Sequence, residues 1–142
     1  AVGYMAIMEK AGLEYTDYSK ISYSSKKDFD GDLYSMFFPK GNEKDTRYYF
    51  DVEYNYDYTS NFKSVDDLII TTENQSGVGK VILFRDSFGN ALHEFFANDF
   101  SEAVISRAFP YDVSDIEGAD LVVVEIVERN IPRLKDAYRA DA

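Results

Sequence analysis

The chain has 142 residues, a length that suits one domain with a core of its own. Its 26 acidic and 15 basic residues give a net charge of -11, which disfavours nucleic acid and anionic membrane surfaces as partners. There is no cysteine, so disulfides, thiolate catalysis and cysteine-bound zinc are excluded. The sequence contains no run of about 18 apolar residues, so no membrane-spanning segment is predicted.

A helix is expected over residues 1–11. Five apolar residues recur near one of its faces: Val2, Met5, Ile7, Met8 and Ala11. Gly12 follows at the position where helices commonly end. Because the sequence starts inside this helix and does not begin with Met, we expect it to be part of a longer chain.

Residues 20–65 are expected to form an inserted segment of short strands. Within it, residues 48–58 alternate tyrosine, phenylalanine or valine with polar and acidic residues, which is the period-two pattern of a strand. Tyrosine offers an apolar ring face and a hydroxyl, so this tyrosine-rich strand is suited to contact carbohydrate.

Strand and helix patterns alternate after residue 65. Strands are expected within 66–80, at 80–84, within 102–109 and within 120–129, and helices or turns at 88–100, 112–119 and 131–142. This order is typical of a parallel sheet with helices on both faces. The sequence therefore predicts a single α/β domain over 1–142, with three layers and a flavodoxin-like sheet.

Ser87 lies between the apolar run 81–84 and a helical pattern, in the stretch VILFRDSFGN. Open α/β sheets bind ligands at the carboxyl ends of their strands. A helix start there supplies unpaired N–H groups that stabilise an oxyanion, and Gly89 permits close approach of a substrate. The pattern therefore suits a nucleophilic serine. The alternative is that Asp86 and Ser87 only cap the helix.

A nucleophilic serine needs a base, usually a histidine. His93 is the one histidine in the chain and follows Ser87 by six positions. Six residues of helix span about 9 Å, whereas direct proton transfer needs ~2.6–3.2 Å. We expect His93 to be a structural residue, and we expect the chain alone to be catalytically silent.

The blocks RDSFGNALHEFFANDFSEAV and DLVVVEIVERNI resemble the DHHW family. These bacterial surface-associated proteins are related to SGNH hydrolases and to the acetyltransferase-like proteins of alginate modification. The opening AVGYMAIMEKAGLEY is similar to the family helix that follows an Asp-x-His motif, so the resemblance implies that this motif lies upstream of residue 1. The resemblance is strongest over 1–18, 80–106 and 119–134.

The resemblance implies an SGNH-like fold, incomplete at its N-terminal side, with Ser87 as the nucleophile. Asp86 is its partner within the block, and an upstream histidine is the base. Arg129 matches a family arginine that supports the oxyanion or binds the substrate. The alternative for Arg129 is a surface ion pair with Glu128 or Asp120.

Gly89 and Asn90 are assigned to substrate binding on the same basis, although Asn90 at a helix start is also suited to a structural role. The implied activity is that of a serine esterase or O-acetyltransferase acting on cell-surface carbohydrate, outside the bacterial cytoplasm and without a metal or organic cofactor. One alternative is a non-catalytic glycan-binding or surface-structural module. A phosphate-binding domain is disfavoured, since the glycine turn at 76–80 lacks a following helix and the remaining P-loop residues.

Overall fold

The computed structural model describes residues 1–136 and 138–139. The chain divides into two compact units. Residues 1–16 and 54 onward form the first unit, and residues 17–53 form the second. The expected insertion at 20–65 overlaps the second unit, but its last residues belong to the first.

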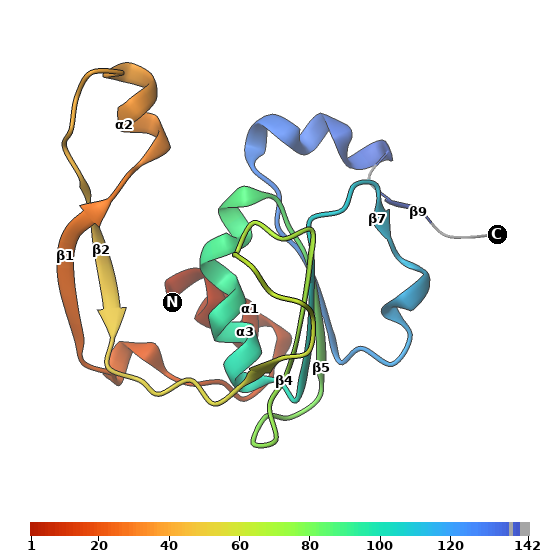
Figure 1. The fold of residues 1–142 in the computed structure, drawn as a ribbon. Coiled ribbons are helices and arrows are strands. Elements are labelled where there is room, and N and C mark those ends of the chain that lie inside the picture. The colour runs from red at the N-terminus through yellow and green to blue at the C-terminus, as the bar shows by residue number, and fades with distance from the viewer. Residues whose placement is uncertain (137, 140–142) are drawn as a thin grey trace. The chain divides into compact units, whose positions relative to one another are not determined.

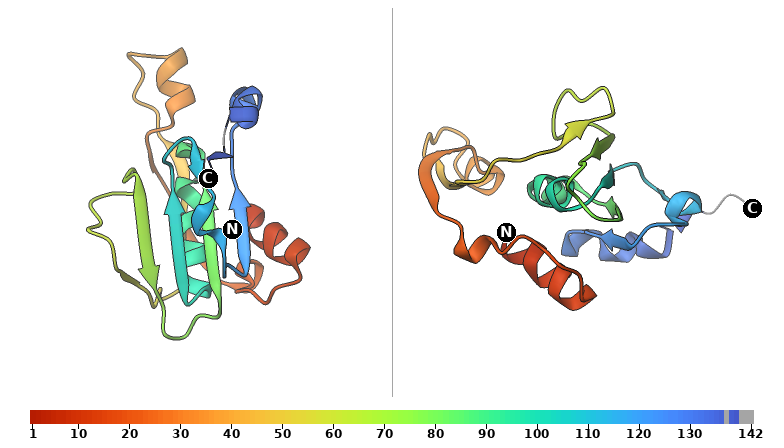
Figure 2. Two further views of the ribbon diagram at one scale, coloured as in Figure 1. Left: turned by 90° about the vertical axis from the view of Figure 1, so that its right-hand side faces the viewer. Right: turned by 90° about the horizontal axis from the view of Figure 1, so that it is seen from below.

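A five-stranded mixed sheet forms the centre of the first unit, and strands of this sheet lie side by side in the left view of Figure 2. In spatial order the strands are β3 (Asp57–Tyr58), β4 (Ile69–Glu73), β6 (Glu102–Ser106), β5 (Lys80–Phe84) and β8 (Leu121–Val124). β5 is parallel to both β6 and β8, whereas β4 is antiparallel to β6 and to β3. The predicted α/β fold is confirmed, but the sheet is mixed and not wholly parallel.

The direction of β4 follows from the length of the connection after it. Only residues 74–79 separate β4 from β5. A connection between parallel strands needs a crossover of about a dozen residues or more. β4 therefore runs opposite to β5 and pairs antiparallel with β6.

The apolar run Val81–Phe84 is buried along its whole length because both faces of the sheet are covered. Helices α1 (Val2–Ala11) and α3 (His93–Asp99) lie on one face, where the rings of Tyr4 and Phe96 are 5.0 Å apart between centroids. On the other face, Phe84 stacks on Tyr111, with 5.1 Å between ring centroids. The predicted three layers are visible in Figure 1.

The remaining elements of the first unit are short. They are η2 (Ser87–Leu92), η3 (Ser114–Ile116), η4 (Glu128–Asp136) and the parallel pair β7 (Tyr111–Asp112) and β9 (Tyr138–Arg139). Leu134 of η4 packs beside Tyr111, against the second face of the sheet.

Helix α1 ends at Gly12, whose φ of 70° lies in the left-handed region that glycine adopts without strain. The helix is as predicted, but its apolar face is predicted only in part: Met8 is buried and Met5 and Ile7 are half-buried, whereas Tyr4 was not expected there. The buried residues are Tyr4 and Met8, whereas Val2 is 79% exposed. Tyr4 turns inward because its ring packs on α3 while its hydroxyl donates a hydrogen bond to Asp99.

The second unit is a β-hairpin with a short helix at its turn. It contains η1 (Tyr18–Lys20), β1 (Tyr23–Phe29), α2 (Asp32–Phe37) and β2 (Asp45–Phe50). β1 and β2 are antiparallel, and Lys26 pairs with Arg47 in their register. Every residue of β1 is exposed.

The single strand expected over 48–58 is wrong. β2 ends at Phe50 and pairs with β1, whereas β3 contains only Asp57–Tyr58 and pairs with β4 in the first unit. Residues 51–57 still alternate between exposed and half-buried side chains. The alternation therefore reflects side-chain burial in an extended segment and does not require a partner strand.

Candidate active site

Ser87 lies at a strand-to-helix turn, as the sequence predicted. β5 ends at Phe84 between two parallel neighbours, and Ser87 begins η2, which runs directly into α3. The turn is therefore at the carboxyl edge of the parallel strands. The Ser87 side chain is exposed, and its hydroxyl has no hydrogen-bond partner among the described residues.

Asp86 caps η2. One carboxylate oxygen accepts from the backbone N–H of Phe88, and the other accepts from that of Val127, both at 2.8 Å. Burial alone would raise the pKa of Asp86, but these hydrogen bonds outweigh it and hold the pKa below its usual value. The capping alternative is thus present in the structure, and the ionised carboxylate ties the turn to the chain after β8.

Glu125 is a residue of this turn that the sequence analysis missed. Its Oε2 accepts from the backbone N–H of Asp86 at 3.2 Å, and the N–H of Gly89 also donates to its carboxylate. Burial, together with the negative charge of Asp86, raises the pKa of Glu125. One signal was available: Glu125 directly follows β8, as Arg85 and Asp86 directly follow β5.

Gly89 is buried and packed closely. A Cβ at this position would lie 2.6 Å from Cβ of Arg85 and 2.8 Å from Oε2 of Glu125. The close approach at Gly89 is therefore made by these two side chains. The sequence analysis had expected Gly89 to leave room for a substrate, but in the structure these two side chains occupy that space.

The backbone amides of the turn are almost all engaged. The N–H groups of Asp86 and Gly89 donate to Glu125, and that of Phe88 donates to Asp86. No described residue accepts a hydrogen bond from the N–H of Ser87. An oxyanion bound at this turn would therefore use the Ser87 amide itself.

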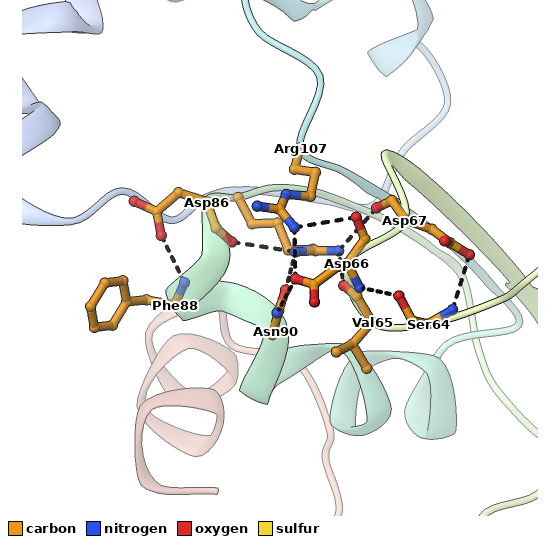
Figure 3. A network of polar contacts seen from close by, with 9 residues as sticks. Ser64, Val65, Asp66, Asp67, Asp86, Phe88, Asn90 and Arg107 are labelled. Carbon is orange, nitrogen blue, oxygen red and sulfur yellow. Dashed lines mark hydrogen bonds and ion pairs between the residues drawn. The ribbon is translucent and has the colours of Figure 1, made fainter. Parts of the chain in front are cut away.

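Arg85 is a second residue that the sequence analysis did not assign to the site. Its side chain is 1% exposed, and its guanidinium donates to Oδ1 of Asn90 and to the carbonyls of Val65, Asp67 and Asp86. Burial lowers its pKa. These bonds fasten the loop before β4 to the start of η2 (Figure 3).

Asn90 belongs to the same network. Its amide oxygen accepts from Arg85, and its amide nitrogen donates to Asp66 at 3.0 Å. Asp66 also accepts from Arg107 at 2.8 Å, as Figure 3 shows. The hydrogen bond from Asn90, more than that from Arg107, lowers the pKa of Asp66. In this structure the Asn90 side chain holds the loop in place.

His93 is a buried residue whose two ring nitrogens both have partners other than Ser87. Its Nδ1 is 3.0 Å from the carbonyl oxygen of Asn90. A carbonyl only accepts, so Nδ1 donates to it, and Nε2 lies 3.2 Å from the Tyr58 hydroxyl. Both nitrogens are engaged, as expected for a histidine that does not serve Ser87.

Arg129 lies on the same edge of the sheet as Ser87. It follows β8, the parallel neighbour of β5, and its guanidinium carbon is 5.6 Å from the centre of the Phe88 ring. No ion pair joins it to Glu128 or Asp120 within the described residues. Arg129 is therefore close to the residue next to Ser87, and its catalytic role stays a prediction.

Solved structures of other proteins share this fold. A DHHW family protein from Eubacterium siraeum is 22% identical, with a TM-score of 0.64 over 86% of this chain. The chain has the fold of a DHHW family protein. PatB1 from Bacillus cereus, in a structure with a sulfonyl adduct, is 16% identical with a TM-score of 0.62 over 92% of the chain. A second PatB1 structure is 17% identical with a TM-score of 0.58, again over 92%.

The resemblance found in the sequence is thus matched by a DHHW-type fold, which is compatible with SGNH-like architecture. The chain spans 52% of the DHHW protein and 56% and 58% of the two PatB1 structures. No family model matches the sequence, and no curated protein matches it significantly.

Of the predicted site residues, the DHHW-type fold brings Ser87, Asp86 and Arg129 to one edge of the sheet. It places Gly89 and Asn90 in the packing beneath them. The described residues contain no cluster of three or more histidines and acids suited to holding a metal ion. None of the helices within 1–136 has the length and apolar character needed to cross a membrane.

Proposed function

We propose that this chain is part of a serine esterase or O-acetyltransferase that acts on cell-surface carbohydrate outside the bacterial cytoplasm, with Ser87 as its nucleophile. One observation carries the proposal: an exposed, unengaged serine hydroxyl at the end of a buried parallel strand, beside its own free amide. The DHHW-type fold supports it, as does the sulfonyl adduct on PatB1, since sulfonyl groups attach to activated nucleophiles such as serine.

In this proposal the Ser87 hydroxyl attacks the acyl carbonyl carbon while a base takes its proton. The negative oxygen of the tetrahedral intermediate accepts from the Ser87 N–H and is stabilised by the guanidinium of Arg129. The alcohol then leaves with a proton, and the acyl group passes from Ser87 to water or to a sugar hydroxyl. Since His93 is engaged elsewhere, the base comes from a segment upstream of residue 1.

The test compares this chain with the same chain extended upstream through the proposed Asp-x-His motif, using p-nitrophenyl acetate as substrate. The extended chain should turn over faster, and Ser87→Ala should abolish the gain. His93→Ala, provided that it folds, should leave the gain in place. The proposal fails if extension brings no gain, or if this chain alone is equally active and loses that activity with His93→Ala.

A glycan-binding function is the second candidate, because aromatic rings follow one another along residues 54–62. Centroid separations are 6.2 Å from Tyr54 to Tyr56, 5.4 Å from Tyr56 to Tyr58 and 3.8 Å from Tyr58 to Phe62. Such ring faces stack on sugars. Saturable oligosaccharide binding that Tyr54→Ala weakens and Ser87→Ala leaves unchanged would favour this function over catalysis.

A further inference from the structure

A cavity of about 130 Å³ lies beside Asp86 at the carboxyl edge of the sheet. Its walls combine three arginines, two aromatic rings and one acid: Arg85, Arg107, Arg133, Phe109, Tyr111 and Asp86. All of them belong to the first unit. Three arginines around one small cavity stand out in a chain whose net charge is -11.

Two of these arginines keep donors available. Arg133 is exposed, its guanidinium carbon lies 4.3 Å from the centre of the Phe109 ring, and it forms no ion pair within residues 1–136. Arg107 bonds Asp66 through Nη1. No described residue accepts from Nη2 or Nε of Arg107.

Arg85 adds a buried positive charge behind the cavity. Its four hydrogen bonds go to three carbonyls and an amide oxygen, all of them neutral. Its Nε is buried and has no partner in the described structure. Burial, and then the charge of Arg107, lower its pKa. A buried cation without a directly bonded carboxylate makes the neighbouring space electropositive.

Asp86 leaves these arginine donors unused. Both of its oxygens accept from backbone N–H groups, those of Phe88 and Val127. No hydrogen bond or ion pair joins the Asp86 carboxylate to a guanidinium among the described residues. The lining residues therefore carry three positive charges and one negative charge, and two further carboxylates lie beside them: Asp66, which is paired with Arg107, and Glu125.

We propose that this cavity binds a small oxyanion, a carboxylate or a phosphate group. Guanidinium groups donate in a planar fork that matches both kinds of anion. Since a water molecule occupies about 30 Å³ of liquid, the cavity has room for such a group and a few waters. Phe109 and Tyr111 provide ring faces for the carbon part of the ligand. The proposal does not depend on Ser87 being a nucleophile.

Calorimetric titration of the whole chain with inorganic phosphate and with acetate, at constant ionic strength, tests the site. Both anions should bind saturably to one site, and phosphate should bind more tightly because of its larger charge. Arg133→Gln should weaken both by roughly tenfold, the effect of losing one charge-assisted hydrogen bond. Lys135→Gln removes the same charge from η4 outside the cavity lining and should leave both affinities unchanged.

A second measurement follows the cavity directly. The side-chain Nε–H signals of Arg107 and Arg133 should shift during the phosphate titration, and the N–H signals of Lys10, on α1, should not. Glucose 6-phosphate decides the source of the anion: tighter binding than inorganic phosphate indicates a group carried on a sugar, and equal binding indicates the free ion. The proposal is overturned if neither anion saturates, if Arg133→Gln binds as the unmodified chain does, or if Lys135→Gln weakens binding equally.

Discussion

The turn after β5 and the β1–β2 hairpin are two regions of the chain that are built differently. In the turn, Arg85 and Gly89 are buried, and hydrogen bonds join most of the polar groups beneath Ser87, although Nε of Arg85 has no partner among the described residues. In the hairpin, all seven residues of β1 are exposed, and its side chains meet mainly across one pair of strands.

The difference indicates where a side chain can be held rigidly enough to take part in a reaction. Buried and mutually bonded residues fix one geometry for their neighbours, and reactive groups need such support. A two-stranded hairpin is marginally stable by itself. We therefore place chemistry at the turn, and the four predictions below test how differently the two regions respond to substitution.

The largest effect is expected for Arg85→Ala. It removes a buried cation and leaves the carbonyls of Val65 and Asp67 without their donor. The free energy of unfolding should fall by about 3–5 kcal/mol, as when one partner of a buried charged network is lost. Urea unfolding followed by circular dichroism measures it. Arg129→Ala, at an exposed position, should stay within about 1 kcal/mol. Equal losses in both variants would remove the distinction between Arg85 and a surface arginine.

Gly89→Ala should have the next largest effect. Its new Cβ meets Arg85 and Glu125 at distances that require both to move. Overpacking of this kind costs roughly 1–3 kcal/mol. Gly3→Ala is the matched control, because a Cβ there meets no atom within 4 Å and alanine favours helix α1 by about 1 kcal/mol. A stabilised Gly89→Ala variant would contradict the packing described here.

Glu125→Gln should change how stability depends on pH. The folded pKa of Glu125 is raised above 4.5, so the stability that its protonation supplies is complete below pH 4.5 and is lost as pH rises through the folded pKa. Glutamine stays neutral. The variant should therefore gain on the unmodified chain as pH rises towards neutrality, by about 1 kcal/mol or less. Urea titrations across this pH range measure the gain, and exposed Glu128→Gln should show none. A difference that is constant with pH would contradict the prediction.

The smallest effect is expected in the hairpin. Tyr49→Phe removes the hydrogen bond of 2.8 Å from the Tyr49 hydroxyl to Asp28, and both side chains are exposed. The unfolding free energy should not change measurably, because water replaces the lost partner.

Hydrogen exchange should also be faster for the amides of β1 than for those of β5. Slow exchange in β1 would show that the hairpin is as well supported as the turn.

The sequence predicted the scaffold of the site well. An apolar run that ends in Arg85, followed by a capping acid and a helical pattern, is a local signal, and the structure has β5, η2 and α3 in those places. The placement of Ser87 and the engagement of His93 elsewhere followed from that signal and from helix geometry.

The sequence did not reveal what supports the turn. Arg85 is satisfied by backbone carbonyls some twenty residues earlier, and Glu125 by amides that any residue would offer. Backbone partners of this kind cannot be recognised from residue types. The end of β2 at Phe50 could not be predicted for a similar reason, because alternating burial continues through residues 51–57 without a partner strand.

The aromatic residues near His93 also provide a spectroscopic signal for the folding of this molecule. The chain has 12 tyrosines and no tryptophan, so its near-ultraviolet signals come mainly from tyrosine. Tyr58 is stacked on Phe62 and bonded to His93, and this fixed, asymmetric setting favours a strong near-ultraviolet circular dichroism band. That band would report the attachment of the loop before β4 to α3.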